Sequence, residues 1–164
     1  MAIAIRPISK KDIEGYFEVF QSVVDEEEYL LFNPGELSFQ KSRNWVLDTI
    51  KRNAVMVVAE VNGKIVGWCD ITPREKEKEK HVGILGIGVD KGYRAKGIGE
   101  ALIRNALERA KQQDLEKVQL GVFASNTRAY EFYKKQGFRE EGREQKAAKI
   151  REKYVDHVLM AKFL

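Results

Sequence analysis

The spacing of apolar residues along the chain switches several times between the period of a strand and the period of a helix. Alternating or continuous apolar runs predict strands, and apolar residues three or four apart predict helices. The predicted strands lie at 3–8, in a hairpin over 54–71, and at 81–89, 117–123, 138–145 and 153–164. The predicted helices begin after Ser9 and near Ser38, and cover about 97–112 and 126–137.

Capping and turn residues mark the ends of several of these elements. Ser9 and Asp12 are typical of a helix N-terminus, and Gly137 suits the end of the last helix. The pair Asn62-Gly63 favours a type I′ turn between two β-branched runs. One face of each of the first three helices is apolar and is expected in the core: Ile13, Tyr16, Phe17, Phe20, Trp45, Val46, Ile50, Ile98, Leu102, Ile103, Leu107 and Ala110.

The order of the predicted elements is β-α-α-β-β-β-α-β-α-β-β. Hairpins mixed with crossover helices predict an α/β (α+β) fold, in which a mixed, mostly antiparallel sheet of about seven strands is flanked by about four helices. A length of 164 residues suits a single domain over 1–164 that buries its own core.

Composition excludes several classes of protein. The chain is 43% hydrophobic and 33% charged, lacks an apolar run long enough to cross a bilayer and has no secretory pattern, so we expect a soluble, cytoplasmic protein with no membrane partner. Cys69 cannot form an internal disulfide, and His81 and His157 have no cysteine companions, so no metal is expected. The net charge of +4 is mild and dispersed, which argues against nucleic acid and fits either an anionic ligand or simple solubility.

The clearest chemical signal is the stretch GVDKGYRAKGIGEALIRNAL, residues 88–107. A strand that passes through a glycine-rich turn into a helix presents unpaired N–H groups at the positive end of the helix dipole, which suits phosphate. Gly97 and Gly99 allow close approach, and Arg94 and Lys96 add positive charge. The P-loop and dinucleotide motifs both fail here, because the first needs Lys and Ser or Thr after the glycines and the second a third glycine. The glycines could instead only shape a tight turn.

The strand before this junction contains Gly83, Gly86 and Gly88, which weaken an otherwise buried strand. Such glycines indicate a bulge or another backbone-like group lying alongside. A ligand that carries amides could pair with this strand and place a pyrophosphate on the junction. Coenzyme A has both parts, pantetheine and pyrophosphate.

Residues 89–103, VDKGYRAKGIGEALI, resemble the signature of the GNAT acetyltransferase superfamily, in which Arg or Gln, two residues, Gly, one residue and then Gly or Ala bind acyl-CoA. Arg94, Gly97 and Gly99 fill these positions. Residues 122–138, VFASNTRAYEFYKKQGF, resemble the second signature of the family. There the matching positions are Asn126, Ala129, Tyr133, Gly137 and Phe138.

The resemblance implies an acetyl-CoA site on the strand that ends at Val89 and on the turn that follows. Ile87 and Val89 would pair with pantetheine and help to polarise the thioester carbonyl, and Gly88 between them is a further candidate cofactor-binding residue. The pyrophosphate would lie on the N–H groups of Arg94, Ala95, Lys96, Gly97, Ile98 and Gly99. Asn126 either bonds the cofactor or caps its helix, and Arg128 and Lys134 either approach the CoA phosphates or lie on a solvated face.

The resemblance also implies direct attack of an amine on the thioester through a tetrahedral intermediate. Tyr133 is the candidate proton donor to the departing thiolate, although from spacing alone it is a core aromatic residue. The general base stays open between a carboxylate and a histidine. The candidates are Glu26, Glu27, Glu28, Glu36, Asp70 and His81.

The expected acceptor is a primary amine of a small molecule, a polyamine, or a protein or peptide N-terminus. The family usually builds its acceptor wall after the first helix, where this chain has DEEEYLLFNPGE at 25–36, and its acids would favour a cationic amine. The last strand, 153–164, lies in the region through which members of this family often form a homodimer. Two other classes compete: a non-catalytic acyl-CoA-binding module, and a basic nucleic-acid-binding domain.

Overall fold

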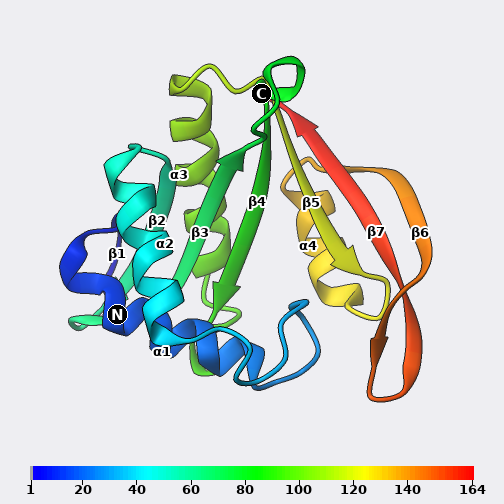
Figure 1. Cartoon of the computed structure of the whole chain (residues 1–164), viewed down its shortest axis with the longest axis horizontal. Helices are drawn as coiled ribbons and strands as arrows, with labels where there is room; N and C mark the ends of the chain where they lie inside the picture. Colours follow the sequence, from blue (N-terminus) through cyan, green and yellow to red (C-terminus); the bar gives the residue numbers. More distant parts are fainter. Residues whose placement is uncertain (1) are drawn as a thin grey trace.

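The computed structural model describes residues 2–164, which form one seven-stranded sheet in the order β1-β2-β3-β4-β5-β7-β6 (Figure 1). Only β4 and β5 run parallel, and every other neighbouring pair is antiparallel. The strands are β1 (Ile3–Pro7), β2 (Val55–Val61), β3 (Lys64–Pro73), β4 (Val82–Val89), β5 (Lys117–Phe123), β6 (Arg139–Ile150) and β7 (Lys153–Phe163). The mixed, mostly antiparallel sheet of the prediction is confirmed.

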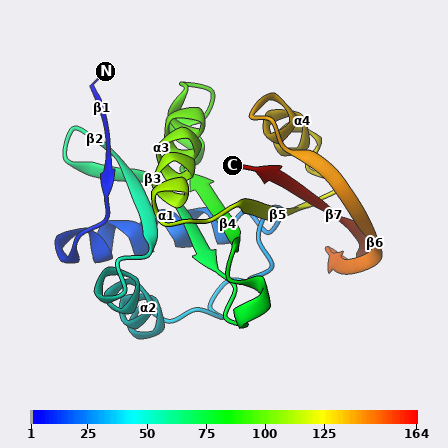
Figure 2. The ribbon, with the colours of Figure 1, turned by 90° about the horizontal axis from the view of Figure 1, so that it is seen from above.

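Four α-helices cover the two faces of the sheet, as predicted. They are α1 (Ile13–Val24), α2 (Phe39–Lys51), α3 (Ile98–Gln112) and α4 (Thr127–Lys135). Helices α1 and α2 lie on one face, and α3 and α4 lie on the other (Figure 2). No helix within residues 2–164 is both long enough and apolar enough to cross a membrane.

Strands β4 and β5 stay together only at their first residues. Their ladder joins Val82 to Lys117, Gly83 to Val118 and Ile84 to Gln119, and it ends there. Beyond it the two strands diverge toward their C-terminal ends, and the segment between α1 and α2 passes below the opening (Figure 1). The second half of β4, from Leu85 onward, therefore has a neighbour only on the β3 side.

The turn between β2 and β3 forms as its sequence predicts. Asn62 and Gly63 have φ values of 50° and 79°, the left-handed pair that a type I′ turn requires. The ladder shifts its register between Ala59 and Glu60, and this bulge reverses the alternation of β3. As a result Ile65 and Trp68, three residues apart, both pack toward α1 and α2.

The core consists of two apolar clusters, one on each face of the sheet. The larger cluster packs α3 against the sheet through the buried Ile98, Leu102 and Ile103. The smaller one packs α1 and α2 against Val58 and Trp68. Among the predicted core residues only four are half-buried, and they lie at the margins of the clusters: Phe17, Trp45, Ile50 and Leu107.

The helix predicted after Ser9 begins with a short 3-10 turn, Lys10–Asp12, before α1 proper. The Ser9 N–H donates to Asp12 Oδ2 at 2.8 Å, so the two residues form the predicted capping pair. Strand β6 is longer than predicted and extends to Ile150. Two register shifts against β7 accommodate its charged sequence, which has little apolar alternation for a pattern to detect.

The glycines of β4 do not mark a bulge, because β3 and β4 pair without any register shift. Instead they leave room for large side chains on β3. A Cβ on Gly88 would lie 2.1 Å from the Trp68 ring, and one on Gly86 would lie 2.9 Å from Asp70 Oδ1. Of the two explanations that the sequence left open, the bulge is wrong at this strand, and packing against β3 accounts for these glycines.

This packing predicts that Gly88→Ala destabilises the protein. The added methyl must push aside the buried Trp68 ring, which costs about 1–3 kcal/mol of unfolding free energy. The matched control is Gly142→Ala, because a Cβ on Gly142 meets no atom within 4 Å. Urea denaturation of both variants measures the difference, and equal stabilities would contradict the steric account.

Candidate active site

The turn from β4 into α3, residues 94–99, has a backbone conformation that suits an anion, and we call this turn the cradle. Gly97 is the N-cap of α3 with φ 79°, and Ala95 before it has φ 60°. A Cβ on Gly97 would meet no atom within 4 Å, so the space in front of this residue is open. A group as large as a phosphate can therefore reach the backbone here.

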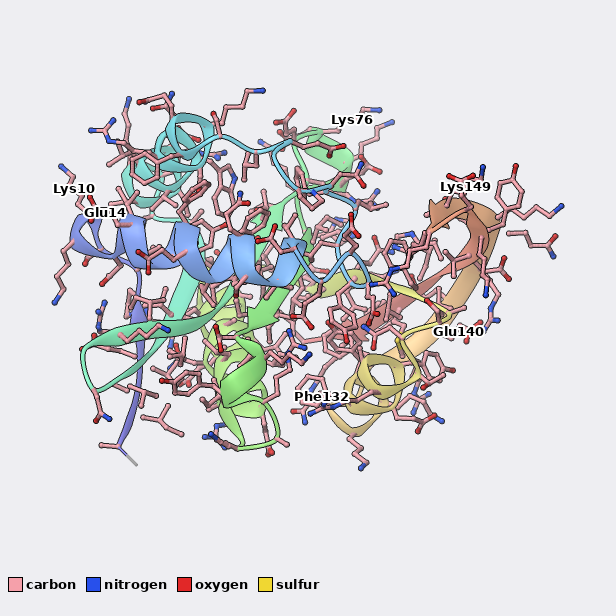
Figure 3. All side chains as sticks on the ribbon, turned by 90° about the horizontal axis from the view of Figure 1, so that it is seen from below. Lys10, Glu14, Lys76, Phe132, Glu140 and Lys149 are labelled. Carbon is pink, nitrogen blue, oxygen red and sulfur yellow. The ribbon has the colours of Figure 1, made fainter. Side chains whose placement is uncertain are left out.

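The first turn of α3 points free N–H groups at this opening. The first bond of the helix runs from the Ala101 N–H to the Gly97 carbonyl at 3.1 Å, so the N–H groups of Ile98 and Gly99 precede the helical ladder. The side chain of Ile98 is buried and anchors this turn in the core. Phe132 of α4 points toward the same turn, and a Cβ on Gly99 would lie 3.3 Å from its ring (Figure 3).

The two cationic side chains of the cradle are already engaged by protein groups. Arg94 donates from Nε to the Val89 carbonyl at 2.8 Å, forms a two-pronged ion pair with Glu26, and stacks 5.1 Å from the Tyr29 ring centre. Lys96 donates to the Gly92 carbonyl at 2.8 Å. The charge of Arg94 is thus compensated by Glu26, whereas Lys96 keeps its positive charge, because its partner is a neutral carbonyl.

The exposed edge of β4 presents two of the three predicted strand residues. The Asp90 N–H bonds to the Val66 carbonyl, which fixes the alternation of the β3–β4 ladder. By this alternation the N–H groups of Ile87 and Val89 point away from β3 into the opening. The N–H group of Gly88 points to β3. Ile87 and Val89 can pair with a ligand, and Gly88 contributes only the space that Trp68 fills.

Tyr133 lies on the α4 face of the sheet. Its ring packs against Phe132 and Phe138, and burial raises its pKa well above the usual 10, with the nearby Cys69 adding to the rise. Cys69 pairs with Ile87 across the ladder, so Tyr133 lies at the level of the β4–β5 opening. Its hydroxyl is protonated at neutral pH, although the match to a thiol is poorer than the sequence suggested.

Asn126 caps its helix, as one of its two predicted roles requires. Its Oδ1 accepts from the Ala129 N–H at 3.1 Å, which leaves the amide nitrogen as the group that could meet a ligand. Arg128 and Lys134 are exposed on α4. Lys134 lies 3.6 Å from Glu131, which fits the solvated face.

Most of the candidate bases are occupied or distant. Glu26 pairs with Arg94, and Glu28 pairs with Arg151 at 3.3 Å. The exposed Glu36 accepts from Asn33, and this bond lowers its pKa and weakens it as a base. His81 precedes β4 at the end opposite Val89, roughly 26 Å along the strand.

Asp70 is the one candidate whose environment suits a base. Burial raises its pKa from 3.8 to about 7, against a hydrogen bond from Trp68 that lowers it. It pairs with Gly86 in the β3–β4 ladder. Burial raises the pKa of Tyr16 on α1, and the charge of Asp70 adds to the rise. Asp70 therefore lies on the α1 face at the level of Gly86. Tyr133 lies on the opposite face at the level of Ile87, the next residue of β4.

A pocket of about 360 Å³ opens on the α1 face between the α1–α2 segment and the β6–β7 hairpin. Most of its exposed surface is polar. Its lining residues are Leu30, Leu31, Phe32, Phe123, Ala147, Ala148 and Ile150, together with Glu27, Asn33, Lys149 and Arg151. The sequence predicted an acceptor wall at 25–36 only, and the hairpin residues of this pocket were not predicted. The signal for the first half is the apolar run YLLF, in which Leu31 remains 68% exposed.

Comparison with other sequences identifies relatives along most of the chain. Residues 18–138 match the sequence profile of the Acetyltransferase (GNAT) family. An uncharacterised N-acetyltransferase of Methanocaldococcus jannaschii is 34% identical over 141 residues, or 83% of this chain and 60% of the relative. The L-amino acid N-acetyltransferase AaaT of Escherichia coli is 34% identical over 107 residues, or 65% of this chain and 66% of the relative. The chain thus spans less than two thirds of the length of these relatives.

Solved structures match the fold over nearly its whole length. An acetyltransferase of the GNAT family from Streptococcus pneumoniae superposes with a TM-score of 0.92 at 28% identity and covers 99% of this chain and 100% of its own. YncA of Salmonella typhimurium, solved with its cofactor acetyl-CoA, has the same TM-score at 16% identity, with 100% and 95% covered, and so supports the fold alone. The profile match, the relatives and the fold together show that the chain belongs to the GNAT acetyltransferase family.

Proposed function

We propose that the protein is an N-acetyltransferase that moves an acetyl group from acetyl-CoA to a primary amine. The observation that carries the proposal is the continuous binding surface formed by the free edge of β4 and the open backbone cradle at Gly97. The edge offers amide groups to pantetheine, and the cradle offers N–H groups and a helix dipole to the pyrophosphate. A cytoplasmic location and a homodimer stay predictions.

Acetyl-CoA supplies the acetyl thioester. Residues of the chain would polarise its carbonyl, take a proton from the amine and return a proton to the thiolate. The Ile87 N–H points into the opening and would polarise the thioester carbonyl. Asp70, on the α1 face, would take a proton from the attacking amine, directly or through water. Tyr133, on the α4 face, would return a proton to the thiolate. The amine thus enters from one face and the thiol leaves toward the other.

The names of two relatives support an amine as the acceptor. Besides the amino-acid enzyme of E. coli, the relatives include an N-alpha-acetyltransferase of Sulfurisphaera tokodaii, 37% identical over 100 residues. The acids at 25–28 give less support to a polycation than the sequence suggested, because Glu26 and Glu28 are paired with arginines. Free small amines and peptide N-termini are the acceptors that this proposal retains.

The two competing functions fit less well. A non-catalytic acyl-CoA-binding module has no need of a buried carboxylate, yet Asp70 has a pKa of about 7 beside the opening. A nucleic-acid-binding domain needs basic side chains that are free to meet phosphates. Here Arg94 is paired with Glu26 and Lys117 with Glu141 at 2.6 Å.

Blocking the cradle should abolish CoA binding. Gly97→Trp fills the open space in front of the helix, so we expect no binding in calorimetry at millimolar CoA. Gly35→Trp is the matched control, since Gly35 has a similar φ of 83° and equally open surroundings in an exposed segment. Normal CoA affinity in the Gly97 variant would show that the cradle is misplaced.

Removing the Tyr133 hydroxyl should lower turnover without weakening CoA binding. Loss of a positioned proton donor costs on the order of 10²-fold in kcat, whereas the ring contacts with Phe132 and Phe138 remain in Tyr133→Phe. Tyr130→Phe, on the same helix but bonded to the exposed Glu140, is the control. Thiol release measures kcat, and unchanged turnover in the first variant excludes Tyr133 from the mechanism.

Asp70→Asn should lower activity and raise stability. A carboxyl with a pKa raised to about 7 binds its proton more tightly in the folded chain, so unfolding free energy falls as pH rises from about 4 to 7. Asparagine cannot ionise and so removes this cost. We expect the unfolding free energy of the variant to exceed that of the parent by about 2–4 kcal/mol at pH 8 and to equal it near pH 4. Turnover of the parent should rise with pH through about 7 and lose this dependence in the variant.

The two measurements on Asp70 are read separately. Urea denaturation at both pH values measures the stability gain, and initial rates between pH 5 and 9 measure the activity. A variant with full activity and the parental pH profile excludes Asp70 as the base, whatever its stability.

A further inference from the structure

His157 is a half-buried titratable side chain that the proposed mechanism does not use. It lies on β7, the neighbour of β5 on the side away from β4 (Figure 1). A Cβ on Gly121 of β5 would lie 2.2 Å from both Cε1 and Nε2 of its ring, so the imidazole leans across β5 and covers this glycine. The ring therefore extends from β7 toward the β4–β5 opening.

The strand registers place this ring at the same level as Asp70. The β4–β5 ladder ends two residues before Gly86 on β4 and two residues before Gly121 on β5. A side chain at either glycine would therefore point to the same face of the sheet, the one on which Asp70 lies. A Cβ on Gly86 would lie 2.9 Å from Asp70 Oδ1. Asp70 and His157 thus lie on one face, at the two sides of the start of the opening.

Two glycines make room for these two side chains. A glycine weakens a strand and often marks the close approach of another group. Gly86 gives this room to a carboxyl, and Gly121 gives it to an imidazole. Apolar side chains would serve packing better, because taking an ionisable group out of water carries a cost. An ionisable group on each side of the opening therefore indicates a shared chemical role.

The His157 ring is oriented by two neighbours. Its Nδ1 lies 3.3 Å from Glu144 Oε2 on β6, and its centre lies 5.6 Å from the centre of the Phe123 ring. A carboxylate can only accept a hydrogen bond, so Nδ1 carries the hydrogen and Nε2 keeps its lone pair. The side chain is 21% exposed, and Nε2, on the Gly121 side, is the nitrogen that remains for a ligand.

Acetylation of a primary amine removes two protons from its nitrogen. An alkylammonium ion has a pKa of about 10.4 and therefore reaches the enzyme protonated at neutral pH. One proton must leave before the lone pair can attack the thioester carbonyl. A second must leave as the C–N bond forms and the C–S bond breaks. A single carboxylate such as Asp70 can hold only one of these protons at a time.

We propose that His157 is a further catalytic residue, whose Nε2 takes the first proton from the bound ammonium group, directly or through one water. This proposal rests on the proposed acetyltransferase activity. Asp70 then takes the second proton during the attack, and Tyr133 protonates the departing thiolate. Asp70 and His157 afterwards release two protons to water, one of which returns to Tyr133. The net reaction converts RNH₃⁺ and acetyl-CoA into the amide RNHCOCH₃, the CoA thiol and H⁺.

The first experiment compares amines of similar shape and different basicity. Ethylamine and 2-phenylethylamine are each paired with the 2,2-difluoro analogue, in which fluorine withdraws electrons and leaves the amine mostly neutral at about pH 8. His157→Gln keeps a polar side chain but cannot take up a proton. His81→Gln is the matched control, because His81 precedes β4 at its far end. Thiol release from acetyl-CoA gives kcat and KM.

We expect kcat of His157→Gln to fall on the order of 10²-fold with the alkylamines and less than about threefold with the difluoro analogues. The analogues arrive without the first proton, so they do not need His157. Asp70→Asn should be slow with both kinds of amine, because the second proton must still leave. Calorimetry should show the parental CoA affinity in His157→Gln, and His81→Gln should match the parent throughout.

A second experiment needs neither an acceptor nor a substitution at His157. The chain has two histidines, and His81→Gln assigns their ring signals in NMR spectra. S-acetonyl-CoA carries a ketone in place of the thioester and cannot transfer its acyl group. We expect this analogue to shift the His157 signals of the parent and to leave those of His81 unchanged, because only His157 lies beside the opening.

Other results would overturn the inference. Unchanged kcat in His157→Gln, or an equal loss with both kinds of amine, contradicts proton transfer to His157 and leaves the acetyltransferase intact. Binding of S-acetonyl-CoA without a shift of the His157 signals does the same. Absence of thiol release by the parent with every amine contradicts the proposed function itself, and the role of His157 with it.

Discussion

An unpaired strand edge in the middle of the sheet is the constraint on which the rest of the structure depends. After Ile84, β4 loses β5 as a neighbour, and the N–H groups of Ile87 and Val89 point into the opening. Backbone groups in a sheet interior are costly to leave without partners, so such an edge persists only where a ligand or water can satisfy it. The divergence also brings both faces of the sheet to one place, where Asp70 and Tyr133 approach from opposite sides. In the proposed mechanism the two side chains would act from opposite faces, Asp70 as proton acceptor and Tyr133 as proton donor.

Two arginines connect the α1–α2 segment to the functional elements around it. Arg94 belongs to the cradle and holds Glu26, while Arg151 belongs to the β6–β7 turn and contacts Glu28. Glu26 and Glu28 of this segment therefore hold neighbouring elements in place and contribute little free negative charge. Because Glu26 compensates the charge of Arg94, a pyrophosphate in the proposed site would meet mainly the fixed N–H groups and the dipole of α3, together with Lys96. The pocket and the cradle also share the Glu26 contact, so a ligand in either site meets the same short segment.

The sequence predicted the parts of the site that are local and missed those that depend on distant pairing. Asn62-Gly63, the Asn126 cap and the Gly97 turn are read from a few adjacent residues, because φ preferences and caps act within one turn. The glycines of β4 were correctly singled out, but their cause, the Trp68 and Asp70 side chains on β3, follows only from the register. The Arg94–Glu26 pair joins residues 68 positions apart, and no pattern reports it. The hairpin half of the pocket was missed for a different reason, since Arg151-Glu152 carries none of the residues that usually signal a turn.

Asp70 illustrates why this site differs from the core around it. The neighbouring residues of β3, Cys69 and Ile71, are fully buried and apolar. The alternation of side chains along a strand would favour either an apolar residue or an exposed polar residue at position 70. Instead a carboxyl lies beneath Tyr16 and Trp68, where burial opposes its charged form. A buried acid of this kind lowers stability near neutral pH, and evolution tolerates such a cost where activity needs the group. The glycine opposite it, Gly86, keeps the carboxyl in contact with the strand edge, since a side chain there would collide with Asp70. Packing, electrostatics and strand pairing therefore meet at the same point of β4, and their agreement supports the proposal that acetyl transfer takes place there.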